Sequence, residues 1–226
     1  MLAAIALIPS APVLVPELAG AAAAEVADLR TAVLTAAAEL PARWVAVGAD
    51  GADQVIAASA VGTFAGYGAD IRVALSPDAD DPVTELPLAA LIAGWVRGQV
   101  NAGRTAEVRV FADAGEAAVY RGMTLRTELE ESPEPVGVLV VADGANTLTQ
   151  SAPGGFDPDS VSAQAALDDA LAAGDVDAVI RCAGGAVGRS AYQVLAGLVG
   201  ARPVQARELY RGAPFGVGYF AGTWLP

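Results

Sequence analysis

The sequence predicts a single α/β domain over residues 1–226, with a largely parallel mixed sheet and helices on both of its faces. Two observations lead to this prediction. Short apolar runs typical of buried strands alternate along the chain with longer segments whose apolar residues follow helical spacing. In addition, a chain of 226 residues with 54% hydrophobic and 17% charged side chains can bury one extensive core.

The first half of the chain alternates strand and helix signals. Residues 2–8 form an apolar run that ends at Pro9, as expected of a fully buried strand. Residues 19–40 are rich in alanine and carry larger apolar residues at helical spacing up to Pro41, which predicts one long helix. The other elements predicted here are strands at 44–48 and 71–75, an acidic surface loop at 76–82 and an amphipathic helix at 86–100.

The second half contains the clearest strand of the chain, at 136–142, where a run dominated by valine and leucine has no polar residue until Asp143. The acidic, proline-containing segment 128–135 before it is expected to cross open solvent. A loop rich in Gly, Pro and Ser follows at 149–159, and its Asp157-Pro158 step is typical of a helix start. The remaining elements are a strand at 107–112, helices at 160–173 and 190–199, and a glycine-rich apolar end with a last strand.

Charge and apolar patterning exclude several classes of partner. The net charge of −13 repels phosphate backbones and anionic lipid surfaces, so neither nucleic acid nor a membrane is expected as a partner. No segment reaches the roughly 20 uninterrupted apolar residues of a bilayer-spanning helix. Residues 1–8 lack the positive start of a secretory signal, so a cytoplasmic location is expected.

The residue types that are missing restrict the chemistry. The chain has no histidine, and therefore lacks both the commonest general base and the commonest transition-metal ligand. Its single cysteine, Cys182, allows neither an intramolecular disulfide nor a thiolate metal cluster.

Three loops are expected to meet at one edge of the sheet. In open α/β sheets the ligand crevice lies beyond the carboxyl ends of the strands. The loops 9–12, 48–51 and 143–146 each follow a predicted strand and are far apart in the sequence. The polar residues that they would bring together are Ser10, Asp50, Asp143 and Asn146.

Several segments carry a family resemblance over nearly the whole chain. They are IPSAPVLVP at 8–16, the strand 138–143 with its loop, GFD at 155–157, GRS at 188–190 and APFGVGY at 213–219. In this order they resemble the LigB-type family of class III extradiol dioxygenases, which includes the Memo-like proteins. The resemblance implies the phosphorylase/hydrolase-like architecture of that family. A generic dinucleotide-binding domain is disfavoured, because the chain has neither a G-x-G-x-x-G after the first strand nor a P-loop.

The resemblance also implies that the family's iron site is missing. Ring-cleaving members hold Fe(II) with two histidines and a carboxylate. By position, Ser10 replaces the first histidine, Asp50 replaces the second, and Asn146 stands where a further histidine is expected. Asp143 matches an aspartate of the same family loop, whereas the segment 185–187, which corresponds to the carboxylate ligand, contains no carboxylate. We therefore expect no Fe(II) and no other cofactor.

Each candidate residue has a second interpretation. Asp50, Asp143 and Asn146 would suit an oxygen-ligated divalent cation, but we prefer ordinary turn and helix-cap roles because glycines neighbour them. Ser10 would act as a nucleophile only with a base beside it, and because the chain has neither histidine nor lysine, that base would be an aspartate. We prefer a hydroxyl that satisfies backbone groups in the proline-flanked loop. Arg189 is predicted to open a helix, where it would bind a ligand carboxylate or, as we prefer, pair with an acidic side chain of the chain.

The leading hypothesis is a family member that has lost the iron site and ring cleavage, and that now acts as a ligand-binding or scaffolding pseudoenzyme with a small-molecule pocket at the old site. The alternative is an enzyme with a rebuilt site, either hydrolytic or dependent on Mg²⁺, Mn²⁺ or Ca²⁺, in which Asp50 and Asp143 act. A third hypothesis is a purely structural subunit. Because the related catalytic subunits associate with partners, a homodimer or another oligomer is also expected.

Overall fold

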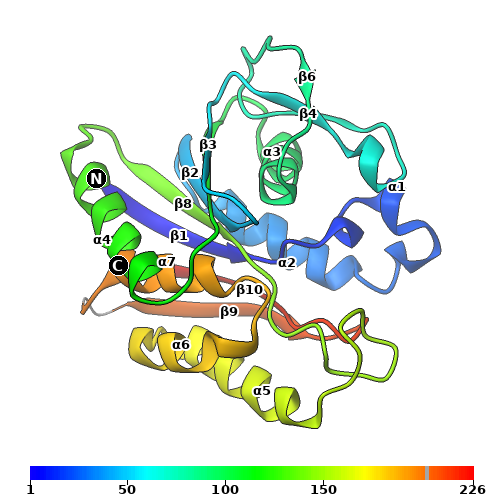
Figure 1. Cartoon of the computed structure of the whole chain (residues 1–226). Coiled ribbons are helices and arrows are strands. Elements are labelled where there is room, and N and C mark those ends of the chain that lie inside the picture. The colour runs from blue at the N-terminus through cyan, green and yellow to red at the C-terminus, as the bar shows by residue number, and fades with distance from the viewer. Residues whose placement is uncertain (202–203) are drawn as a thin grey trace.

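A seven-stranded mixed sheet runs through the centre of the computed structural model, which describes residues 1–201 and 204–226 (Figure 1). In order across the sheet, the strands are β3 (Gln54–Ile56), β7 (Thr105–Phe111), β2 (Arg43–Ala49), β8 (Val136–Val141), β1 (Leu2–Ile8), β10 (Tyr219–Leu225) and β9 (Gln205–Gly212). The four central strands β7, β2, β8 and β1 are parallel, whereas β3 and the pair β10–β9 join the two ends antiparallel. Because the central strands are parallel, their carboxyl ends lie at one edge of the sheet.

Helices cover both faces of this sheet, as predicted (Figure 1). One face packs against α2 (Ala27–Ala38) and α3 (Leu88–Val100), and the other against α4 (Glu116–Glu131), α5 (Pro158–Ala173), α6 (Val176–Cys182) and α7 (Arg189–Val199). Successive strand residues alternate between the two cores, so that Ala6 and Ile8 of β1 face the first and Ile5 and Leu7 face the second. The structure therefore confirms the predicted α/β domain with two covered faces.

A smaller sheet packs beside α3. Its strands, in order, are β5 (Arg72–Ala74), β4 (Val61–Thr63) and β6 (Val83–Thr84). Arg97 of α3 is buried and donates hydrogen bonds to the carbonyl oxygens of Ala74, Ala102 and Arg104 at 2.8, 2.5 and 2.9 Å. These bonds connect α3 to the strand β5 and to the turn that leads into β7.

The prediction of one helix over 19–40 was wrong. α1 (Pro16–Ala19) ends at Gly20, which has a φ of +53°, and α2 begins only at Ala27. Glycine adopts a positive φ without steric cost, whereas a right-handed helix requires a negative one. Between these helices the chain forms a short 3₁₀-helix at Gly20–Ala23 and then a turn, so the alanine-rich composition did not give one continuous α-helix.

The prediction of an open connection at 128–135 was also wrong in its first half. α4 continues to Glu131 because Leu125 and Leu129 are buried against the second core. The rest of α4 is too polar to show helical periodicity in the sequence. The short elements α6, β3, β4 and β6 were likewise not predicted.

α4 and α7 cross with their backbones in contact at two glycines. A Cβ atom on Gly122 would lie 2.0 Å from the carbonyl oxygen of Val194, and one on Gly197 would lie 1.9 Å from that of Val119. The crossing leaves no room for a side chain and fixes the position of α7. In the part of the chain that the structure describes, no helix has the length and apolar character to cross a membrane.

Candidate functional site

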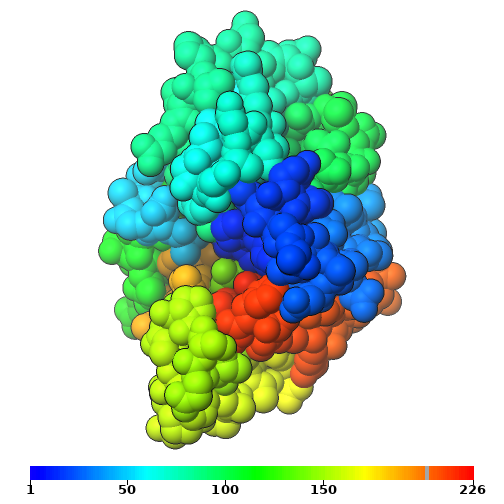
Figure 2. All heavy atoms as spheres, turned by 90° about the vertical axis from the view of Figure 1, so that its right-hand side faces the viewer, coloured from blue at the N-terminus to red at the C-terminus, as the bar shows by residue number. Residues whose placement is uncertain are grey.

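A cavity of about 720 Å³ opens at the carboxyl ends of the central strands. Figure 2 faces this side of the molecule and shows it hollowed near the centre, between segments that are far apart in the sequence. The lining residues are Ser10, Ala49, Asp50, Gln54, Tyr67, Glu85, Leu86, Pro87, Leu88, Ala112, Ala114, Val141, Ala142, Asp143, Val187, Gly188, Arg189 and Ser190.

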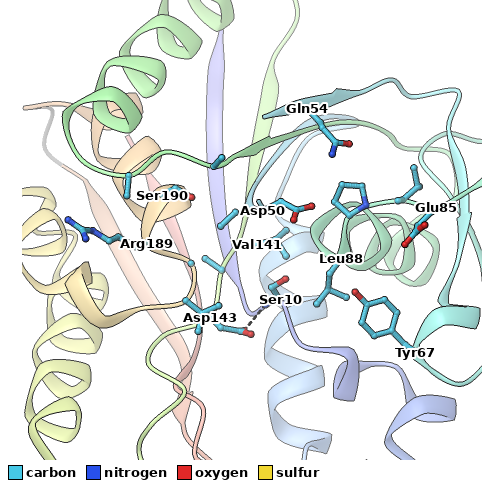
Figure 3. Close-up of a pocket in the computed structure, with 18 residues that line it drawn as sticks. Ser10, Asp50, Gln54, Tyr67, Glu85, Leu88, Val141, Asp143, Arg189 and Ser190 are labelled. Carbon is cyan, nitrogen blue, oxygen red and sulfur yellow. Dashed lines mark hydrogen bonds between the residues drawn. The ribbon is translucent and has the colours of Figure 1, made fainter. Parts of the chain in front are cut away.

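Four of the five residues singled out in the sequence line this one cavity: Ser10, Asp50, Asp143 and Arg189 (Figure 3). Ser10 follows β1, Asp50 follows β2, and Asp143 follows β8 by two residues. Parallel pairing of these strands explains the meeting, because it places the three loops at the same edge.

Asn146 does not line the cavity, so the structure does not bring it together with the other candidates. The backbone N–H of Gly144 donates to Gly218 at 2.8 Å and that of Ala145 donates to Gln164 Oε1 at 2.7 Å. These bonds draw the chain toward β10 and α5 immediately after Asp143. Asn146 instead lies against Gly154, whose N–H donates to the Asn146 carbonyl oxygen at 2.9 Å.

Asp143 is less exposed than the other two acidic residues of the cavity, Asp50 and Glu85. The backbone N–H of Ser10 donates to Asp143 Oδ1 at 2.8 Å (Figure 3), and no other described residue donates a hydrogen bond to this carboxyl group. Burial raises the pKa of Asp143 from 3.8 to about 7, although the hydrogen bond from Ser10 opposes that shift. Near neutral pH the group is therefore present both with and without its proton.

Asp50 and Glu85 lie on the exposed wall of the cavity beside Tyr67 (Figure 3). Asp50 Oδ1 accepts a hydrogen bond from the N–H of the next residue, Gly51, at 2.6 Å. Neither carboxylate forms an ion pair with a described residue. Burial, and then the charges of Asp50 and Glu85, raise the pKa of the Tyr67 hydroxyl, so both carboxylates act on that part of the wall.

The start of α7 forms the opposite wall and is held rigidly. The N–H of Gly188 donates to the Asp143 carbonyl oxygen at 2.9 Å, and the hydroxyl of Ser190 donates to the carbonyl oxygen of Phe111 at 2.8 Å. Gly188 is required here, because a Cβ atom on it would lie 2.5 Å from that of Ala142. These contacts connect the helix directly to the ends of β8 and β7.

Arg189 opens α7, as predicted, but the ion pair that we preferred for it is not found. Its side chain is exposed and makes no ion pair with any residue in the described ranges. In Figure 3 it extends away from Ser10 and Asp50. The guanidinium therefore does not neutralise the carboxylates of the cavity.

Comparison with solved structures finds a related fold. The crystal structure of an uncharacterized protein from Escherichia coli K12 matches with a TM-score of 0.57 and covers 99% of this chain and 100% of its own. The two sequences are 13% identical, so the match shows a shared fold and nothing about activity. No family model matches the chain, and no curated protein matches it.

The residues of the cavity do not fit the iron that the resemblance implies. That site requires imidazole donors, and the chain contains no histidine. Among the described residues, no group of three or more Asp, Glu, Cys or His side chains is placed to hold a metal ion. The alternative of a divalent cation held by oxygen ligands loses one of its three candidate ligands. Asn146 lies outside the cavity, whereas Asp50 and Asp143 line it.

Sequence reasoning missed Gln54, Tyr67 and Glu85, which also line the cavity. All three lie between β2 and α3, where strands of two or three residues carry too little periodicity to be recognised. The one available signal was Glu85 immediately before the predicted helix 86–100, which would place a carboxylate near the start of that helix.

Proposed function

We propose that this protein binds a small organic molecule in the cavity, and that it is a relative of the class III extradiol dioxygenases without iron-dependent ring cleavage. The observation that carries the proposal is the meeting of Ser10, Asp50 and Asp143 in one cavity, in a chain that has no imidazole. The volume of about 720 Å³ lies within the range of small-molecule sites, roughly 300–1,000 Å³.

The construction of the cavity supports a binding role. The backbone N–H of Gly188 donates to the carbonyl oxygen of Asp143, and that of Ser10 donates to its carboxyl group, so the polar groups are positioned before a ligand arrives. Burying Asp143 with a single hydrogen bond costs stability, because its charged form is desolvated. A costly polar group in a preformed cavity is typical of a functional site.

Narrowing the cavity tests this function. Ala114→Trp places a large side chain on an exposed lining position, and we expect it to weaken binding of small-molecule fragments by at least about tenfold. The measurement is saturation-transfer NMR with a fragment library. Ala173→Trp, on the exposed end of α5, is the matched control and should leave the same fragments bound. Fragments that bind both variants equally, or a wild type that binds none, would contradict the proposal.

Metal ions should have no effect on this protein. We expect Fe²⁺, Mg²⁺, Mn²⁺ and Ca²⁺ each to leave the melting temperature unchanged, because an ion that binds only the folded state would raise it. Catechols with Fe²⁺ should give no enzymatic oxygen uptake. Stabilisation by one of these ions that Asp50→Ala abolishes would instead support the second candidate, an enzyme with a rebuilt site that uses Asp50 and Asp143.

Self-association, a scaffolding role and a cytoplasmic location stay predictions.

A further inference from the structure

The charged groups of the cavity are unequally distributed. Asp143, Asp50 and Glu85 line it, whereas Arg189, the one cation among the described lining residues, extends away from Ser10 and Asp50 (Figure 3). Neither wall carboxylate is paired with a described cation. The interior of the cavity is therefore negative at neutral pH.

A second observation distinguishes this cavity from an acidic surface patch. The Asp143 side chain is mostly buried but keeps some accessible surface, and it lines the cavity, whereas Asp50 and Glu85 are exposed. Ser10 N–H occupies Oδ1, while Oδ2 receives no hydrogen bond from the residues that the structure describes. Because Asp143 lines the cavity and no described residue donates to Oδ2, this oxygen can accept a hydrogen bond from a ligand.

The chemistry of these groups selects the charge of the ligand. A neutral ligand would displace water from Asp143 and leave its charge without compensation, and an anion would be repelled by all three carboxylates. A cation with N–H donors would pair with Asp143 Oδ2 and be attracted by Asp50 and Glu85. The net charge of −13 also attracts cations to the molecule. A metal ion is disfavoured, because no group of three metal-ligating side chains is found in the described part of the chain.

We propose that the cavity recognises an organic cation, a protonated amine or amidine, whose N–H groups donate to Asp143 Oδ2 and whose charge lies between Asp143 and the wall carboxylates Asp50 and Glu85. The half-exposed ring of Tyr67 on the same wall offers a face for a cation–π contact. This inference rests on the proposed function, since it names the class of molecule that the cavity binds.

Three probes of similar shape and different charge test the inference at pH 8. Benzamidinium, benzamide and benzoate are titrated into the 226-residue protein by calorimetry. Benzamidinium should bind at least about tenfold more tightly than benzamide, and benzoate should not bind. Equal or tighter binding of benzamide or benzoate would overturn the inference but leave the proposed function in place. Failure of all three to bind would also overturn it, while the fragment test with Ala114→Trp decides the proposed function separately.

Matched variants identify the carboxylates involved. Asp143→Asn keeps the shape of the side chain and should weaken benzamidinium binding at least about tenfold, because it removes a charge-assisted hydrogen bond. The double variant Asp50→Asn/Glu85→Gln alters only exposed side chains and should weaken benzamidinium binding severalfold. It therefore provides a second test if Asp143→Asn does not fold. Asp78→Asn removes the same charge outside the cavity and should have no effect. Equal weakening by Asp78→Asn would show that net charge, not the cavity, attracts the cation.

Discussion

Asp143→Asn is expected to make the protein more stable than wild type at pH 8. The pKa of Asp143 is about 7 in the folded state and 3.8 for an ordinary aspartate, so the folded state binds more protons between these pH values. Stability that is fully present below pH 3.8 is therefore lost as the pH rises through 7. At about 1.4 kcal/mol per pKa unit, the loss is on the order of 4 kcal/mol above pH 7. Asparagine carries no charge to desolvate and keeps an oxygen to accept the N–H of Ser10.

Denaturant unfolding at pH 5 and pH 8 measures this effect. Wild type should lose more free energy of unfolding between the two pH values than Asp143→Asn. Asp168, whose pKa burial raises to about 6, titrates in the same window in both proteins, so the difference between them isolates Asp143. Asp78→Asn serves again as the control and should follow wild type. If Asp143→Asn is less stable than wild type at pH 8, the ionised carboxyl group stabilises the fold and our account of its burial is wrong.

Gly197→Ala is expected to destabilise the protein by at least about 3 kcal/mol, because the helix crossing has no space for the added methyl group. Its Cβ would lie 1.9 Å from the backbone oxygen of Val119, and a backbone atom cannot rotate aside as a side chain would. α4 and α7 would have to separate, and the second core that both helices cover would open with them. Gly122→Ala, on the other side of the crossing, should behave in the same way.

Gly98→Ala provides the matched control for this substitution. Gly98 lies in α3, is exposed, and has no atom within 4 Å of the position that an added methyl group would occupy. Alanine should there stabilise the protein by up to about 1 kcal/mol through its better helix propensity. The test is chemical denaturation of the three variants. A loss below about 1 kcal/mol for Gly197→Ala would mean that the helices do not cross as closely as described.

Much of the fold could be predicted because its central strands are long and apolar. β1 and β8 are buried on both faces, and they appear in the sequence as the apolar runs LAAIALI and VGVLVV, with no polar residue. The meeting of Ser10, Asp50 and Asp143 followed from the same signal, since parallel strands place their following loops at one edge. The Asp157 cap of α5 was also predicted correctly, because its side chain accepts the N–H of Asp159 within the adjacent turn.

The sequence by itself therefore determined the α/β class, the edge at which the cavity forms and the absence of imidazole from it. Only the tertiary structure decided which side chains face that cavity. Asn146 turns away because bonds to Gly218 and Gln164 direct its loop, while Tyr67 and Glu85 enter from a segment with no clear periodicity. A buried strand can be recognised from the apolar pattern of its own residues. The orientation of a loop instead depends on contacts with residues that are far away in the chain.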